Sequence, residues 1–337
     1  MKITITDVAR VAKVSKASVS AVINNKPTVS PKTREKILKV IKKLNYRPNE
    51  VARSLSSRKT KSFGLVIKEI DNPYFARVMK GVFDVCCELG YTVLLGSSEL
   101  SPAQEFQSIE TLTNQRVDGL IISPLQGADS DFSYLSDLIH DHYPLVMLGE
   151  VKNYTTSFVD VDNVNAAHQA VSYLIKLGHT EIAYFSGPAY SVHSFDRLQG
   201  YQQAHIDHNL PIHKDFIIEV GSYIENGFQA GKKLFSRQSK TPSAVFCYND
   251  LVAIGLINAL IESNINVPDQ VSVIGFDDID ICGSIKIPLT TIHVPAYEIG
   301  RKASELLIRQ IQNSDQLLNE KIILKTRLVE RNSCTKR

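Results

Sequence analysis

Residues 4–24 read TITDVARVAKVSKASVSAVIN, a stretch that predicts two short helices joined by a tight turn. Thr4 and Asp7 have the spacing of a capping box, which marks the start of the first helix. Ser15 can cap the second helix by accepting hydrogen bonds from its N–H groups. Apolar side chains recur at helical spacing at Val8, Ala9, Ala12, Val19, Val22 and Ile23. Two helices joined in this way have the geometry of a helix-turn-helix.

A third helix is expected to follow the first two. Ser30 can cap it, and Pro31 stands at its first position, where a missing N–H has no consequence. Its inward stripe is predicted at Ile37, Ile41 and Leu44. Three helices of this size can bury a small common core. By pattern alone the segment could also be a generic three-helix bundle.

Charge divides this chain into two parts. Residues 1–61 hold sixteen Lys and Arg against three Asp and Glu, a net charge of +13. The whole chain is only +3, so the remaining 276 residues carry about −10. A cationic head on an anionic body is typical of a module that meets a polyanion, and nucleic acid is the first candidate.

The motifs of this head also occur in a known family. They are Ile5-Thr6-Asp7-Val8-Ala9, Val14-Ser15, Val19-Ser20, Val22-Ile23-Asn24, Val29-Ser30, Thr33-Arg34, Tyr46, Pro48-Asn49 and Ala52-Arg53-Ser54-Leu55. Together they resemble the amino-terminal domain of the lac-repressor (LacI/GalR) family of bacterial transcription regulators. The match is dense over the first sixty residues and continues more loosely over nearly all of the remaining chain.

The resemblance implies a small all-α helix-turn-helix DNA-binding domain joined by a hinge to an α/β, two-lobed, periplasmic-binding-protein-like effector domain with parallel sheets. The expected boundaries are 1–47 for the headpiece, 48–61 for the hinge and 62–337 for the effector-binding and dimerisation domain. Within that domain we expect the N-lobe at about 62–160 plus 292–320, and the C-lobe at about 161–291 plus 321–331.

By the same resemblance, Lys16, Ala17 and Ala21 face base edges in the major groove. Lys16 can donate hydrogen bonds to guanine, whereas the two alanines offer only methyl contacts. Phosphate contacts, which set the register on DNA, are expected from Ser15, Ser18, Asn24, Ser30, Thr33 and Arg34. Further DNA-binding residues are Thr6, Tyr46, Asn49 and Ala52. Each hydroxyl could instead be a plain helix cap or a surface group.

The hinge has a second expected role. In the family that it resembles, this segment becomes helical on operator DNA and wedges a leucine into a central base step of the minor groove, and that leucine here is Leu55. Unstacking the base pairs costs a few kcal/mol, which the contacts of a bent duplex offset. An ordinary linker with Leu55 exposed is the alternative, because Ser54, Ser56 and Ser57 have linker composition.

From Ser62 onward, apolar runs alternate with amphipathic stretches. Strands are expected at 64–67, 92–95, 119–122, 145–148, 182–185, 244–247 and 271–274. Helices are expected at 74–89, 104–114, 166–177, 227–235 and 251–263. Apolar strands separated by helices predict parallel sheets covered on both faces, and about 275 residues suit two such lobes.

Ligands of such sheets bind beyond the carboxyl ends of the strands. The residues that follow the predicted strands, including 71–75, 248–250, 276–278 and the loop from Gly187 to Arg197, form a polar set that suits a sugar or another small polar molecule. The resemblance implies effector contacts at Tyr74, Phe75, Ser123, His193, Arg197, Tyr223, Asn249 and Asp277. Helix caps at Asn249 and Asp277, core packing of Tyr74 and Phe75, and a structural ion pair of Arg197 are the alternatives.

Other classes of protein find little support. No nucleotide-binding glycine motif, nucleophile elbow or zinc-protease motif occurs, so neither an enzyme nor a cofactor is expected. Five cysteines without C-x-x-C spacing predict reduced thiols in a cytoplasmic protein, and no metal site is expected. No apolar signal region and no run of the roughly eighteen residues that a membrane span needs are present.

Three functions therefore compete at this point. The first is a repressor that acts as a homodimer on operator DNA and responds to a small effector. The polar tail of the chain, residues 331–337, lacks the leucine heptads that join dimers into tetramers, so a dimer is expected. The second is a regulator controlled by a protein partner. The third is a small-molecule carrier, which the basic head opposes.

Overall fold

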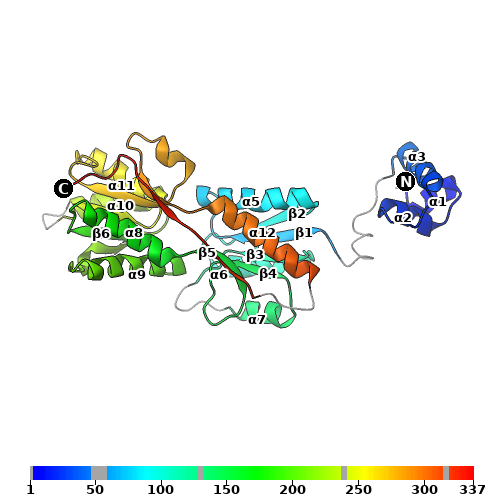
Figure 1. Ribbon diagram of the computed structural model, residues 1–337, viewed down its shortest axis with the longest axis horizontal. Coiled ribbons are helices and arrows are strands. Elements are labelled where there is room, and N and C mark those ends of the chain that lie inside the picture. The colour runs from blue at the N-terminus through cyan, green and yellow to red at the C-terminus, as the bar shows by residue number, and fades with distance from the viewer. Residues whose placement is uncertain (1–2, 47–58, 127–131, 237–240, 314–318) are drawn as a thin grey trace. The chain divides into compact units, whose positions relative to one another are not determined.

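The computed structural model describes residues 3–46, 59–126, 132–236, 241–313 and 319–337. The chain forms two compact units, Met1–Thr60 and Lys61–Arg337 (Figure 1). Each unit has its own hydrophobic core. The hinge prediction and the DNA contacts predicted at Asn49, Ala52 and Leu55 lie outside the described residues.

The headpiece contains the three helices that the sequence predicts, α1 (Ile5–Ala12), α2 (Lys16–Ile23) and α3 (Pro31–Lys43). The capping box is confirmed, because Thr4 Oγ1 accepts from Asp7 N at 3.4 Å and Asp7 Oδ2 accepts from Thr4 N at 3.0 Å. The core contains Val8, Ala9, Ala12, Val19, Val22 and Ile37, with Ile23, Ile41 and Leu44 partly buried against it. The predicted inner faces therefore meet in one core.

The body consists of two lobes, each built on a six-stranded sheet. The N-lobe contains β1 (Ser62–Ile67), α5 (Pro73–Leu89), β2 (Thr92–Ser97), α6 (Pro102–Asn114), β3 (Gly119–Ile122), α7 (Ser133–His140), β4 (Leu145–Leu148), β5 (Ser157–Val161), α12 (Ala296–Gln312) and β11 (Lys321–Leu324). The C-lobe contains α8 (Asn163–Lys176), β6 (Ile182–Ser186), α9 (Val192–Asp207), η1 (Lys214–Phe216), β7 (Ile217–Glu219), α10 (Ile224–Phe235), β8 (Ala244–Cys247), α11 (Asp250–Glu262), β9 (Ser272–Asp277), η2 (Asp280–Gly283), β10 (Thr290–His293) and β12 (Arg327–Val329).

The strand order is β11-β5-β4-β3-β1-β2 in the N-lobe and β12-β10-β9-β8-β6-β7 in the C-lobe. Every pairing is parallel except that of β12 with β10. The predicted two lobes with parallel sheets are therefore confirmed, with one antiparallel edge strand. Both sheets end at the same cleft, since their carboxyl ends carry the residues that line it.

The chain passes between the lobes three times, after β5, after β10 and between β11 and β12. Two of the expected lobe boundaries need correction. β10 ends at His293 in the C-lobe, so the expected start of the N-lobe segment at 292 is about two residues early. β11 pairs with β5, which places 321–324 in the N-lobe and not in the C-lobe.

Helices cover both faces of the N-lobe sheet (Figure 1). Along β1, Leu65 packs into the cluster that contains α5 and α12, whereas Val66 packs into the cluster that contains α6. Glycines let α5 and α12 approach closely, because a Cβ at Gly81 would lie 2.1 Å from the Tyr297 carbonyl oxygen. In the described part of the chain, no helix is both long and apolar enough to cross a membrane.

Candidate functional site

Helix α2 has one face buried in the headpiece core and another face exposed to solvent. Val19 and Val22 lie in the headpiece core, whereas Lys16 and Ala17 at the start of the helix are exposed and Ala21 is half-buried. Lys16 and Ala17 therefore contribute nothing to the core. This is the arrangement that a recognition helix needs, with its first residues directed at base edges.

Two of the serines that we predicted to contact phosphate are also helix caps. Ser15 Oγ accepts from Ser18 N at 3.0 Å at the start of α2, and Ser30 Oγ accepts from Thr33 N at 3.4 Å at the start of α3. The N-terminus of a helix presents N–H groups and positive potential to an anion. The capping role and a phosphate contact are compatible, so the phosphate role of these serines stays a prediction.

Arg34 braces the loop between α2 and α3. Its NH1 donates to Asn25 Oδ1 at 2.6 Å, and its NH2 donates to the Lys26 carbonyl oxygen at 3.1 Å. Arg34 thus has a structural role that the sequence did not predict, beside any contact with phosphate. Among the other predicted DNA contacts, Thr6 and Asn24 are exposed, and Ser18, Thr33 and Tyr46 are half-buried.

A cleft with a cavity of about 50 Å³ lies between the two lobes of the body. It is lined by the predicted Tyr74, Phe75, Ser123, His193, Arg197, Asn249 and Asp277, and by Lys68, Glu69, Asn72, Leu148, Val159, Asp160, Val161, Asn163, Tyr248, Val294 and Ile299. The apolar and aromatic side chains form its walls, and the charged side chains come from both lobes. The polar groups of this lining can orient a small ligand, and pockets that hold one typically enclose about 300–1,000 Å³, so binding requires a wider cleft than this one.

The structure places one of the predicted site residues differently from the rest and shows one segment in a different conformation. Tyr223 precedes α10 and lines a neighbouring groove together with Pro73 and Ile281, and it is absent from the cleft lining. His193 and Arg197 lie on the helix α9, where we expected a loop. The sequence of α9 hides the helix because charged and amide side chains interrupt its apolar stripe.

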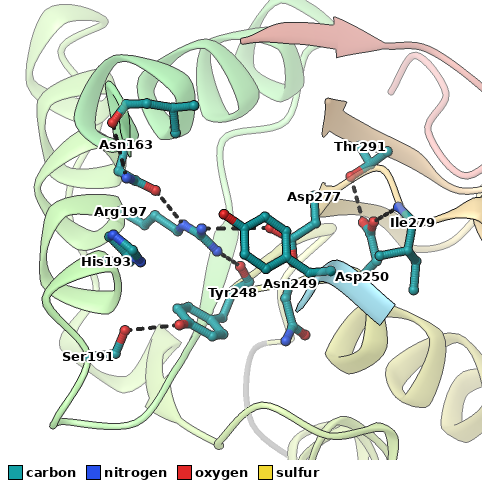
Figure 2. Close-up of polar contacts among 12 residues, drawn as sticks. Asn163, Ser191, His193, Arg197, Tyr248, Asn249, Asp250, Asp277, Ile279 and Thr291 are labelled. Carbon is teal, nitrogen blue, oxygen red and sulfur yellow. Dashed lines mark hydrogen bonds and ion pairs between the residues drawn. The ribbon is translucent and has the colours of Figure 1, made fainter. Parts of the chain in front are cut away.

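Arg197 is the centre of the polar network in the cleft (Figure 2). Its Nε donates to Asn163 Oδ1 at 3.2 Å, its NH1 donates to the Tyr248 carbonyl oxygen, and its NH2 lies 3.8 Å from Asp277 Oδ1. The Phe276 ring covers one face of the guanidinium, with 3.6 Å between its centroid and Cζ. These contacts hold the plane of the guanidinium in one orientation, which preorganises its remaining donors for a ligand.

Asp277 ends β9 and faces Arg197 (Figure 2). Its φ of 113° is rare for a residue with a side chain, and such strain concentrates at functional sites. Burial raises the pKa of Asp277 well above its usual range, although Arg197 opposes the rise. The distance of 3.8 Å to Arg197 exceeds a hydrogen bond. The Asp277 carboxyl therefore keeps hydrogen-bonding capacity for a ligand.

Asn249 and Asp250 fix the start of α11 and the turn that follows Asp277. Asn249 Oδ1 caps α11, and its Nδ2 donates to the Ser222 carbonyl oxygen at 2.8 Å, so the helix-cap interpretation holds for Asn249. Asp250 is fully buried and accepts from Ile279 N at 2.9 Å and from the Thr291 hydroxyl at 2.5 Å (Figure 2). Burial raises the pKa of Asp250 to about 6.

Three hydrogen bonds, which we call the inter-lobe clasp, join the lobes beside the cleft. They are His193 Nε2 with Asp160 Oδ2 at 3.2 Å, Ser222 Oγ to Glu69 Oε1 at 2.6 Å, and Gln126 N to Tyr190 O at 2.8 Å. Burial acts to raise the pKa of Asp160, but the charge of His193 and its hydrogen bond outweigh this effect and the pKa is lowered. Asp160 therefore remains ionised in the clasp.

Sequence reasoning missed four polar residues of the cleft. Lys68 and Glu69 directly follow the apolar run of β1, so the position rule for strand ends could have found them. Asp160 lies in β5, a strand that the sequence pattern did not reveal, and Asn163 begins α8 just after the first passage between the lobes. The residues that were found and those that were missed line the same cavity, and of the four missed residues Asn163 bonds directly to Arg197.

Comparisons with known proteins show which families this architecture matches. Residues 4–49 match the model described as bacterial regulatory proteins, lacI family, and residues 171–334 match the model described as a periplasmic binding protein-like domain. The HTH-type transcriptional repressor PurR of Histophilus somni (strain 2336) is 36% identical over 308 residues, which is 91% of this chain and 92% of that protein.

The chain belongs to the lacI family of bacterial regulatory proteins. A structure of the lac repressor dimer bound to operator and the anti-inducer ONPF superimposes with a TM-score of 0.88 at 27% identity, covering 99% of this chain and 100% of that one. The transcriptional regulator CelR–cellobiose complex gives 0.73 at 29% identity, covering 98% and 100%. This member of the lacI family is thus a DNA-binding transcription repressor with a domain for a small metabolite, as the sequence predicted.

Proposed function

We propose that this lacI-family protein represses transcription as a homodimer, and that a small polar effector of the sugar class binds in the cleft and changes its affinity for operator DNA. The observation that carries the proposal is the buried pair of Arg197 and Asp277, which meet from α9 and β9 between aromatic walls. A donor fork opposite a carboxyl group suits vicinal hydroxyls, since each hydroxyl both donates and accepts.

The effector site comprises Tyr74, Phe75, Ser123, His193, Arg197, Asn249 and Asp277 in this proposal. Arg197 and Asp277 hold the polar atoms of the ligand, and Phe75 covers an apolar face. Asn249, whose side chain is held as a cap, contributes mainly by fixing the strand end. The complex of the relative CelR with cellobiose supports a sugar.

Control of DNA binding follows from the position of the cleft between the lobes. A ligand shifts a conformational equilibrium only by the difference between its affinities for the two states. The inter-lobe clasp and the effector contact the same strand ends, so binding changes the relative stability of the lobe arrangements. Couplings of this kind typically amount to about 1–3 kcal/mol.

For the DNA side, we propose base contacts by Lys16, Ala17 and Ala21. We propose phosphate contacts by Ser15, Ser18, Asn24, Ser30, Thr33 and Arg34. The net charge of +13 over residues 1–61 supports strong phosphate binding. The lac repressor dimer on operator supports a homodimer. DNA binding also implies that the protein acts in the cytoplasm.

The test is a thermal-shift screen of sugars, sugar acids, sugar phosphates and nucleosides on the full-length protein, followed by light scattering. We expect stabilisation by a compound that Arg197→Ala no longer binds, and a dimer at micromolar concentration. A protein that is stabilised equally with and without Arg197 would contradict the cleft assignment. A stable tetramer would contradict the assembly.

A further inference from the structure

Lys68 differs from the other charged residues of the cleft. It follows β1 directly, lines the cavity and is only 6% exposed. Among the described residues, none accepts a hydrogen bond from its Nζ, and no carboxylate lies close enough for an ion pair. Nζ is also not among the fully enclosed atoms without a partner, so it retains access to the cavity. Lys68 therefore presents up to three donors to the cavity.

The other charged groups of the lining have partners within the protein. Glu69 accepts from Ser222 Oγ and, at 3.1 Å, from Asn72 Nδ2. Asp160 pairs with His193, and Arg197 has the three partners described above. A buried donor without a partner costs free energy, and the cost is larger for a charged group. Lys68 is thus the buried charged residue of the lining whose donors have no partner among the described residues.

Nearby carboxylates stabilise the charge of Lys68 without forming a hydrogen bond or an ion pair with it. Burial lowers its pKa, and the charges of Glu105, Asp160 and Glu69 oppose this effect. Glu105 itself is engaged elsewhere, since it accepts from Leu125 N at 2.8 Å and from a tyrosine hydroxyl at 2.5 Å. These carboxylates supply a favourable field, but the donors of Lys68 remain available.

We propose that Lys68 binds a carboxylate group of the effector, so that the effector is a sugar acid and not a neutral sugar. This inference rests on the proposed function of the cleft. A neutral hydroxyl could accept one hydrogen bond but would leave the buried charge without a counter-ion. A phosphate group carries up to about two negative charges, so Glu69 and Asp160 in the same cavity would repel it up to about twice as strongly as a carboxylate. A single carboxylate matches a single ammonium group in charge and accepts several hydrogen bonds.

The experiment measures binding by isothermal titration calorimetry to the full-length protein. The probes are D-glucuronate, D-galacturonate and D-gluconate, each compared with glucose and galactose, with glucose 6-phosphate and adenosine as further probes. The variants are Lys68→Met, which keeps the length of the side chain and removes its charge, and Lys68→Arg, which keeps the charge. Lys68→Gln replaces the Met variant if that protein does not fold, as judged by circular dichroism and operator binding.

We expect at least one sugar acid to bind the wild type, with an affinity that falls about 10- to 100-fold in Lys68→Met. Lys68→Arg should recover part of the loss, and the affinity for neutral sugars should change less than threefold. An unchanged affinity of the sugar acid in Lys68→Met would overturn the inference.

Neutral sugars that bind through Arg197 while every sugar acid fails would also overturn it, but would leave the proposed function intact. Failure of all probes to bind would overturn both proposals.

Discussion

The inter-lobe clasp makes a quantitative prediction about Ser222. Its hydroxyl donates to Glu69 at 2.6 Å, and both residues are buried, with exposed fractions of 3% and 4%. A hydrogen bond to a charged group contributes about 1.5–3 kcal/mol, and its loss leaves the carboxylate undersatisfied. Asn72 Nδ2 still donates to Glu69 at 3.1 Å. We therefore expect Ser222→Ala to lower the free energy of unfolding by an amount near the lower end of this range.

The assay is urea unfolding at neutral pH, with Ser98→Ala as the matched control. Ser98 is also a fully buried serine, but its hydroxyl has no hydrogen-bond partner among the described residues. Ser98→Ala should therefore leave stability unchanged or raise it slightly. A double-mutant cycle of Ser222→Ala with Glu69→Ala should show a coupling of at least about 1 kcal/mol. Equal effects of the two serine variants, or additive effects in the cycle, would refute the clasp.

Three further predictions concern packing, pH and DNA. Gly81→Ala should destabilise the body by about 1–3 kcal/mol in urea, because its Cβ would meet the Tyr297 carbonyl; Gly283→Ala, whose Cβ would meet only one atom at 3.9 Å, should change little. Burial raises the pKa of Asp250 to about 6 in the folded state. The contribution of its protonated carboxyl to the free energy of unfolding is therefore complete below about pH 4 and is lost as pH rises through 6. Between pH 4 and 8, the free energy of unfolding should therefore fall less for Asp250→Asn than for the wild type, by up to about 3 kcal/mol. An equal fall in both proteins would contradict the assignment. Operator affinity should fall by about three or more decades between 50 and 200 mM salt, and Lys16→Ala should reduce the preference for operator over random DNA in gel-shift titrations.

Local sequence patterns predicted the strands that contain runs of apolar residues, including β2, which is partly exposed. The strands β1, β3, β4 and β8 are continuous apolar runs, and the structure buries each of them along its whole length. The strand β5 includes a polar Asp160 and β10 begins with two threonines, so neither has the pattern of an apolar strand. Helix α9 was missed because charged and amide side chains such as Asp196 and Gln199 interrupt its apolar stripe.

The residues of the cleft also divide into those that the sequence predicts and those that only the folded chain brings together. Arg197, Asp277 and Phe75 could be predicted because they stand near predicted strand ends and match the family motif. The bond of Ser222 to Glu69 joins residues 153 positions apart, so only the packing of the two lobes brings them together. Likewise, the lack of a partner for Lys68 among the described residues is a property of the folded cleft and leaves no trace in the local sequence.

The most direct test of the central claim is operator binding with and without effector, measured by fluorescence anisotropy of labelled DNA. The proteins are the wild type, Arg197→Ala and Asp277→Asn, with Arg309→Ala as a control because Arg309 pairs with Glu320 on the surface. The effector is the compound that stabilises the wild type in the screen.

We predict that effector changes the operator affinity of the wild type and the control by the same factor. The two cleft variants should bind operator as the ligand-free wild type does and show no change when effector is added. Cleft variants that keep the full response to effector would contradict the claim that the cleft controls DNA binding.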